Sequence, residues 1–440
     1  MIKLKLSITF YISLLLVISL SCKKDPSHGV AFEGGLLYNG HSFDSKTFYV
    51  IDGLISFVSP GTVDSTIQLN KRYVIPPFGE AHNHNVDDYN IEEKIEKYLS
   101  QGIYYVKVPN ILPRSRQAVD SMINGPNSID AVFANGGLTS TGGHPIGLVD
   151  FNIKRGVFQE DDGEGQFYHT VNETSELLEK WPQILSGNPD FIKTYLLHSE
   201  EYKKRKNDTA FFAWKGLSPA VLKQVVGKAH EADLKVSTHI ETAADFRHAV
   251  LAEVDEINHF PGFRPQPQYF DTLSIYKIDE ATARAAGEQH TTVVTTLAFL
   301  LEEMHEMDEK VSAEMKEILE HNITLLKKYD VPIAIGSDNY GGTSYDEARA
   351  LVQSELFNNH EILHMWTLNT VATIFPDKKL GYIKEGYIAN FLVLPKNPLE
   401  DFDNCQNISM MVKEGKILRT MPGNTFTPGA CLPLVWKPGK

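Results

Sequence analysis

The chain has 440 residues, of which 42% are hydrophobic and 22% are charged. This length is sufficient for a large domain together with a small accessory domain. The chain carries 42 Lys and Arg against 56 Asp and Glu, which gives a formal net charge of −14. Such an excess of negative charge argues against nucleic acid as a partner. It also weakly disfavours strongly acidic substrates, although a local site can override the net charge.

The chain begins with a segment that is typical of a targeting signal. Lys3 and Lys5 precede an apolar stretch, residues 6–20, that is short for a membrane span. The stretch ends in Ser19-Leu-Ser-Cys22, which resembles the lipobox of bacterial lipoproteins. The resemblance implies cleavage before Cys22 and lipidation of its thiol. An ordinary cleaved signal peptide is the alternative.

We therefore expect residues 1–21 to be a lipoprotein signal peptide and residues 22–29 to be a tether. The mature protein would be extracytoplasmic and anchored by lipid to a bacterial membrane, on the periplasmic or outer-membrane side. Two cysteines remain, Cys405 and Cys431. An oxidising compartment permits a disulfide between them, and two unpaired thiols are the alternative.

Both ends of the chain contain short strand-like segments separated by turns. In residues 30–72, the apolar run 48–51 meets Asp52-Gly53, a strong hairpin sequence. A similar pattern of short apolar runs occupies residues 381–440. We therefore predict one small β-sandwich domain that is built from both segments.

Residues 73–380 alternate between strand-like and helix-like segments. Ser218-Pro219, for example, combines a capping residue with a proline at the first helical position. Eight strands that alternate with helices predict an α/β domain of the (β/α)8 TIM-barrel type. The long segments 136–170 and 198–216 are expected at the carboxyl ends of the strands, where such barrels hold their active sites. The predicted strands are 73–77, 103–109, 130–135, 191–197, 235–240, 256–260, 291–297 and 332–337.

Residues that can bind metal follow or end several of these strands. Taken singly, each has a structural explanation, because a histidine can fill a core, a lysine can point outward and an aspartate can cap a turn. In a closed barrel, however, the carboxyl ends of the strands converge on one rim. Imidazoles and carboxylates suit zinc and similar divalent ions. The set therefore predicts a metal site, formed by His82, His84, Lys193, His239, His259 and Asp338.

These residues in this strand order resemble the amidohydrolase superfamily, in particular its imidazolonepropionase-like and Xaa-Pro dipeptidase (prolidase)-like branch. The resemblance covers about residues 30–420 and includes His82-Asn-His84, a lysine on strand 4 and an aspartate after strand 8. One departure is Pro77-Phe-Gly-Glu80, where a Pro-Gly-Leu-Ile-Asp type of sequence is more usual. The departure bears on the subfamily rather than on the metal site.

The resemblance implies two divalent metal ions, with zinc the expected element. His82, His84 and Asp338 would hold one ion, and His239 and His259 the other. Lys193 would be carboxylated, because a free ammonium cannot bind a cation, and its carbamate would bridge both ions. A bridging hydroxide would be the nucleophile, with Asp338 as general base and then general acid. Lys193 favours a binuclear amide hydrolase over the mononuclear nucleobase deaminases.

Two further residues are candidates for substrate binding. The sequence Thr141-Gly-Gly-His144 resembles the substrate-binding loop of the dipeptidase-like relatives, which implies that His144 contacts a substrate carbonyl or carboxylate. A glycine-rich turn with a solvent-facing histidine is the alternative. Tyr195 lies two residues after Lys193 and therefore on the same side of a strand, where it either reaches the pocket or fills the barrel. Histidines in helical patterns, such as His360 and His364, are interpreted as surface or packing residues.

The sequence thus predicts a metal-dependent hydrolase of an amide bond in a small molecule. A dipeptide or a related cyclic or N-acylated compound is the preferred substrate. Hydrolysis of a lactone or phosphoester at the same site is the second hypothesis, and a non-catalytic lipoprotein that binds a ligand is the third. A homo-oligomer is compatible with the sequence, which does not determine the oligomeric state.

Overall fold

The computed structural model describes residues 28–420. The predicted signal peptide, Cys22 and Cys431 lie outside the described residues. Within them, Cys405 is a buried free thiol. No helix in this range is long and apolar enough to cross a membrane.

Parallel strands form the centre of the molecule, in two sheets. Within residues 28–420 one sheet has three strands in the order β6-β7-β8, and the other has seven in the order β10-β9-β11-β12-β13-β14-β15. The bounds are β6 (Phe78–Glu80), β7 (Ile103–Val108), β8 (Asp130–Phe133), β9 (Gly137–Thr139), β10 (Tyr168–Thr170), β11 (Ile192–Tyr195), β12 (Val236–His239), β13 (Glu256–Asn258), β14 (Thr292–Val294) and β15 (Ile333–Ala334).

Backbone hydrogen bonds link the two parallel sheets at two places. The Ala81 amide after β6 donates to the Ile335 carbonyl after β15, at 2.9 Å. Asp190, just before β11, donates to the Phe133 carbonyl at the end of β8, at 2.8 Å. The arrangement is an α/β fold with parallel sheets, as predicted, and it is consistent with a TIM barrel.

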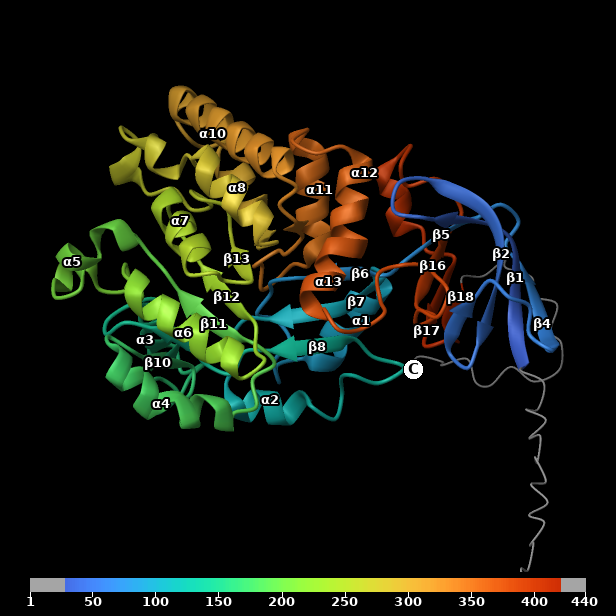
Figure 1. Cartoon of the computed structure of the whole chain (residues 1–440), viewed down its shortest axis with the longest axis horizontal. Helices are drawn as coiled ribbons and strands as arrows, with labels where there is room; N and C mark the ends of the chain where they lie inside the picture. Colours follow the sequence, from blue (N-terminus) through green and yellow to red (C-terminus); the bar gives the residue numbers. More distant parts are fainter. Residues whose placement is uncertain (1–27, 421–440) are drawn as a thin grey trace, which may run out of the picture.

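Helices cover the outer side of the parallel strands (Figure 1). The predicted helix start at Ser218 is confirmed, since its hydroxyl accepts a hydrogen bond from the Val221 amide at 3.2 Å. The bounds are α1 (Ile91–Ser100), α2 (Pro113–Val119), α3 (Ile146–Lys154), α4 (Thr174–Ser186), α5 (Tyr202–Arg205), α6 (Pro219–Glu231), α7 (Ala243–Leu251), α8 (Glu280–Glu288), α9 (Ala298–Glu303), α10 (Glu309–Lys328), α11 (Ser344–Ser354), α12 (Asn359–His364) and α13 (Thr370–Ile374).

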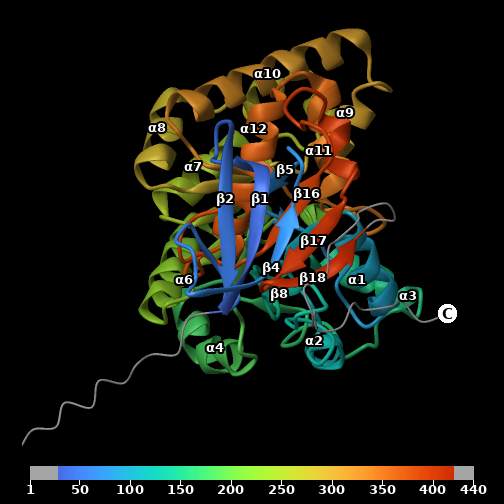
Figure 2. The same cartoon turned by 90° about the vertical axis from the view of Figure 1, so that its right-hand side faces the viewer.

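Strands from both ends of the described chain join in one mixed sheet beside the parallel strands (Figures 1 and 2). Its order is β18-β17-β16-β5-β1-β2-β3, and β4 pairs with β1. The sheet has a separate core that includes Phe32, Phe48 and Phe391. The bounds are β1 (His28–Tyr38), β2 (Phe43–Ile51), β3 (Leu54–Ser56), β4 (Thr62–Gln68), β5 (Tyr73–Ile75), β16 (Phe391–Leu394), β17 (Met410–Lys413) and β18 (Lys416–Thr420).

The strand predicted at 73–77 is not the first parallel strand. Its ordered part, β5, pairs with β1 and β16 in the mixed sheet, and β6 is the strand that pairs with β7. The physical reason is the pair Pro76-Pro77 between them. Proline has no amide hydrogen, so two in succession interrupt the ladder and separate one apolar run into two strands.

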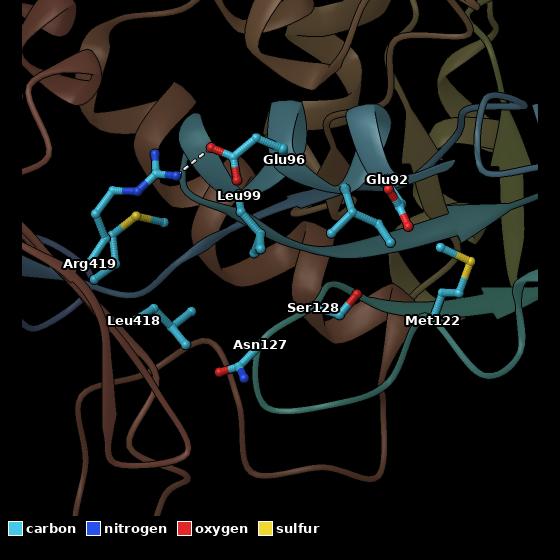
Figure 3. Close-up of a pocket in the computed structure, with 10 residues that line it drawn as sticks. Glu92, Glu96, Leu99, Met122, Asn127, Ser128, Leu418 and Arg419 are labelled. Carbon is cyan, nitrogen blue, oxygen red and sulfur yellow. Dashed lines mark hydrogen bonds and ion pairs between the residues drawn. The ribbon is translucent and has the colours of Figure 1, made fainter. Parts of the chain in front are cut away.

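A cavity of about 520 Å³ lies where the mixed sheet meets the helical layer (Figure 3). Leu99 of α1 and Leu418 of β18 line it, and an ion pair joins Glu96 to Arg419 at its edge. None of the predicted site residues lines this cavity. The candidate site therefore lies elsewhere, at the carboxyl ends of the parallel strands.

Candidate metal centre

The histidine pair after β6 contacts the aspartate after β15. The Nε2 atoms of His82 and His84 lie 3.6 and 3.5 Å from Oδ1 of Asp338. The backbone fixes this arrangement, because the Asp338 amide donates to the His82 carbonyl at 2.8 Å. Gly336 provides the necessary space, since a Cβ there would lie 2.8 Å from His82.

His259 completes a three-residue metal-ligand group with His82 and Asp338. One ligand atom from each of the three lies within 4.8 Å of the others. The His239 ring is adjacent, with its centroid 4.6 Å from that of His259. The structure therefore brings the predicted histidines and the aspartate together. The tightest group, however, combines His82 and Asp338, which were predicted to hold one ion, with His259, which was predicted to hold the other.

Lys193 lies on β11 and is 1% exposed. Its ammonium donates a hydrogen bond to Oδ1 of Asn258, the residue before His259. Burial lowers the pKa of Lys193 to about 7, and the charge of Asp338 acts in the opposite direction. A substantial fraction of this amine is therefore uncharged near neutral pH.

Two of the candidate ligands have left-handed backbone conformations. His259 has φ of 79° and Asp338 has φ of 46°. Such conformations are strained in residues other than glycine, and they concentrate at functional sites. Thr296, which contacts His259, also has a positive φ of 51°. The backbone at this rim is thus held in place by the surrounding structure.

Hydrogen bonds orient two of the imidazoles. Nδ1 of His259 lies 2.7 Å from the Thr296 hydroxyl, so Nε2 is the ring nitrogen that is left to bind a metal ion. Nε2 of His239 lies 3.2 Å from a carboxylate oxygen of Glu241, so Nδ1 is the nitrogen that is left to bind a metal ion. Partners of this kind fix the tautomer and ring orientation of metal-binding histidines.

The imidazoles are held in the form that binds metal. Burial lowers the pKa values of His82, His239 and His259 well below the ordinary range, and neighbouring positive charge adds to the effect. Neutral imidazole is the form that ligates metal. Nδ1 of His82 is buried without a hydrogen-bond partner. The donor set therefore fits divalent ions such as zinc.

The two predicted substrate residues lie against the same histidines. The His144 ring stacks on the His239 ring at 5.1 Å between centroids and is 5.1 Å from the Tyr195 ring. The Tyr195 hydroxyl accepts a hydrogen bond from Asn110 at 3.2 Å. Position 143 requires glycine, because a Cβ on Gly143 would lie 2.7 Å from the Lys215 carbonyl oxygen. The glycine-rich loop thus brings His144 to the site.

Several residues that support the ligands were not identified from the sequence. Thr296 and Asn258 carry no recognisable motif, although Asn258 directly precedes a candidate ligand. Glu80 could have been identified from the sequence, because it lies two residues before His82 in the unusual Pro77-Phe-Gly-Glu80 sequence. Its buried carboxylate accepts hydrogen bonds from the Ser337 amide and hydroxyl, both at 2.8 Å. It therefore connects the strand before the histidine pair to the segment before Asp338.

Fold and site together define a metal-binding α/β protein whose ligands lie at the carboxyl ends of parallel strands. A model of the Amidohydrolase family matches residues 199–418, which is half of the chain. The matched segment contains His239, His259 and Asp338. The chain belongs to the amidohydrolase family, and it is a metal-dependent hydrolase of carbon–nitrogen bonds.

Solved structures with similar folds include members of the branch that the sequence suggested. Ochratoxinase from A. niger is 19% identical, with a TM-score of 0.68, and the match covers 91% of this chain and 97% of that one. A prolidase in complex with N-methylphosphonate-L-proline is also 19% identical, with a TM-score of 0.66 and coverage of 89% and 100%. A Xaa-Pro dipeptidase with bound methionine is 19% identical, with a TM-score of 0.65 and coverage of 88% and 99%. At such identities the similarity establishes the fold. No curated protein matches this chain.

Proposed function

We propose that this protein is a binuclear metal-dependent hydrolase that cleaves an amide or peptide-type bond of a small substrate. The observation that carries the proposal is the convergence of His82, His259 and Asp338, with Lys193 buried beside them. His82, His84 and Asp338 would hold one ion, His239 and His259 the other, and a carboxylated Lys193 would contribute to both.

Bound zinc ions would polarise the scissile carbonyl and make a water molecule nucleophilic at neutral pH. The side chains of this chain have distinct roles. Asp338, whose Oδ1 lies near both His82 and His84, accepts the proton of the attacking water and delivers it to the leaving nitrogen. His144 and Tyr195 bind the substrate on the side of the site that faces His239.

A carboxylated Lys193 is supported by its surroundings. Within the part of the chain that the structure describes, no ion pair joins Lys193 to a carboxylate, and its hydrogen-bond acceptor is the neutral amide of Asn258. A buried ammonium without a carboxylate partner is unfavourable. After the ammonium loses a proton, the neutral amine adds carbon dioxide through a new N–C bond and releases a second proton, which leaves an anionic carbamate that the neighbouring metal ions would stabilise.

The domain boundaries and the membrane anchor belong to the same proposal. The two parallel sheets would close into one (β/α)8 barrel, with the mixed sheet as a composite sandwich domain. The amino-terminal lipobox-like sequence would place the enzyme outside the cytoplasm, on a bacterial membrane. Incorporation of labelled palmitate that is lost in Cys22→Ser would support the anchor, and equal labelling of both chains would contradict it.

Hydrolysis of a panel of compounds by the metal-loaded protein tests the reaction. The panel contains dipeptides, N-acyl amino acids, lactones and phosphotriesters. Turnover of the first two classes, reduced in His144→Ala but not in the surface variant His230→Ala, supports the proposal. Turnover of lactones or phosphotriesters alone favours the second reaction type. A metal-loaded chain that turns over none of them and binds a ligand tightly is a binding protein.

A further inference from the structure

Three histidines that are not part of the candidate metal centre lie close together, between the mixed sheet and the helical layer. His41 lies in the turn between β1 and β2, and His360 and His364 lie on α12. The centroid of the His41 ring is 5.7 Å from that of His360 and 6.2 Å from that of His364, and the two helical rings are 6.3 Å apart. Both views place the β1–β2 turn beside α12 (Figures 1 and 2).

The spacing along α12 is favourable for shared coordination. His360 and His364 are four residues apart, so their side chains lie on one face of the helix. A His-x3-His spacing is also common among zinc ligands. His41, which comes from a different part of the chain, approaches the same face.

The His364 ring is already oriented by the turn that carries His41. Its Nδ1 lies 3.1 Å from the carbonyl oxygen of Gly40, the residue before His41. A carbonyl can only accept, so Nδ1 carries the proton and Nε2 keeps its lone pair. A hydrogen bond of this type, from the nitrogen that does not bind metal to a backbone carbonyl, is characteristic of metal-binding histidines.

The distances between the rings are compatible with one ion after small movements. A Zn–N bond of about 2.0–2.1 Å places the centroids of three tetrahedrally arranged rings roughly 5 Å apart. The present separations are larger by roughly 1 Å, and the His41 and His360 rings are stacked at 11° instead of converging on a point. Rotation of these two rings is needed. His41 is exposed and His360 is partly exposed, so such rotamer changes are fast.

We propose that His41, His360 and His364 form a second metal site, which binds a divalent transition metal such as Zn²⁺ through three imidazoles, with water as a further ligand. The ion would join the β1–β2 turn to α12 and therefore the mixed sheet to the α/β part. Because it binds the folded chain, it would stabilise the fold by mass action. The proposal does not depend on the catalytic activity.

Zinc binding to the full chain tests this site. The protein is first saturated at the candidate metal centre and then titrated with Zn²⁺ by calorimetry. We expect the unmodified chain to bind one more ion than His360→Ala, and its melting temperature to rise with added Zn²⁺. His305→Ala, which removes an exposed histidine before α10, is the matched control and should behave like the unmodified chain.

His41→Ala provides a second variant, because an exposed turn residue can be replaced with little effect on folding. It should also lose one ion. Equal zinc uptake and equal zinc-dependent shifts in melting temperature for the unmodified chain, His41→Ala and His360→Ala would overturn the proposal.

Discussion

Two regions of the parallel strands each bury a lysine, and the two lysines differ in the partner that their side-chain nitrogen contacts. At the metal-ligand rim, Lys193 on β11 is hydrogen-bonded to the neutral side chain of Asn258. Elsewhere in the parallel sheets, Lys107 on β7 is 3% exposed and forms an ion pair with Glu256 of β13 at 2.9 Å. Breaking a buried ion pair is costly, and so is burying a charge that forms no direct ion pair. On this comparison we propose a structural role for Lys107 and a chemical one for Lys193.

Replacement of Lys193 should have the largest effect on activity. Lys193→Met keeps most of the side-chain volume but cannot be carboxylated. We expect the turnover rate to fall by about 100- to 1000-fold, as when another group that stabilises transition-state charge is removed. Stability should change little, because a buried charge without a carboxylate partner is removed. Full activity in Lys193→Met would show that the lysine is structural.

Lys107→Met is the matched substitution in the other region. It leaves the Glu256 carboxylate buried without its partner, which should lower the free energy of unfolding by about 3–5 kcal/mol. The folded fraction should retain its metal content. Denaturant unfolding and metal analysis measure the two quantities. Unchanged stability together with lost metal would reverse the roles that we assign to the two lysines.

Thr296→Val tests the hydrogen bond that orients His259. Valine has the shape of threonine but cannot bond to Nδ1, so metal affinity should fall by about 10- to 100-fold. Thr194→Val is the control, because the Thr194 hydroxyl bonds to Thr238 at 2.7 Å and not to a candidate ligand. Metal competition with a chelator gives the affinities. Equal affinities for the two variants would show that the Thr296 hydroxyl does not support the ligand.

The last prediction concerns pH dependence and a buried carboxyl outside both regions. Glu347 accepts hydrogen bonds from the Leu297 and Ala298 amides at 2.7 and 2.8 Å, yet burial raises its pKa from 4.5 to about 7. Between these pH values the folded state binds more protons than the unfolded state. Its contribution to stability therefore falls as pH rises, by at most about 1.4 kcal/mol per pH unit.

Glu347→Gln removes this titration. Between pH 4.5 and 7, the free energy of unfolding should fall more steeply with pH in the unmodified chain than in the variant. Identical pH profiles would show that Glu347 ionises normally despite its burial.

The sequence was sufficient to predict the alternation of strands and helices and to bring the candidate ligands to one rim, because each ligand is adjacent to a strong apolar run. It could not separate β5 from β6, since Tyr73 to Phe78 reads as one apolar segment and the partner strands are distant. The strand patterns alone also could not separate the roles of the two lysines, and Lys193 was singled out by the family resemblance. The partner of Lys107 is 149 residues away, and both lysines occur in similar apolar strands.

The same limitation applies to the histidine cluster between the mixed sheet and α12. His360 and His364 were interpreted as surface or packing residues, because a helical pattern contains no information on His41. His41 lies more than three hundred residues earlier and contacts them only in the folded chain. Contacts between segments distant in sequence therefore account for most of what the sequence could not predict.

Metal content tests the central claim, which is that Lys193 is part of a two-metal site. The measurement uses His360→Ala chains, so that the separate histidine cluster does not contribute, purified from bicarbonate-containing medium and passed through gel filtration. We expect two tightly bound divalent ions per chain, and no more than one when Lys193→Met is added. A single ion in the chain that retains Lys193, or two ions in the chain that lacks it, would contradict the account.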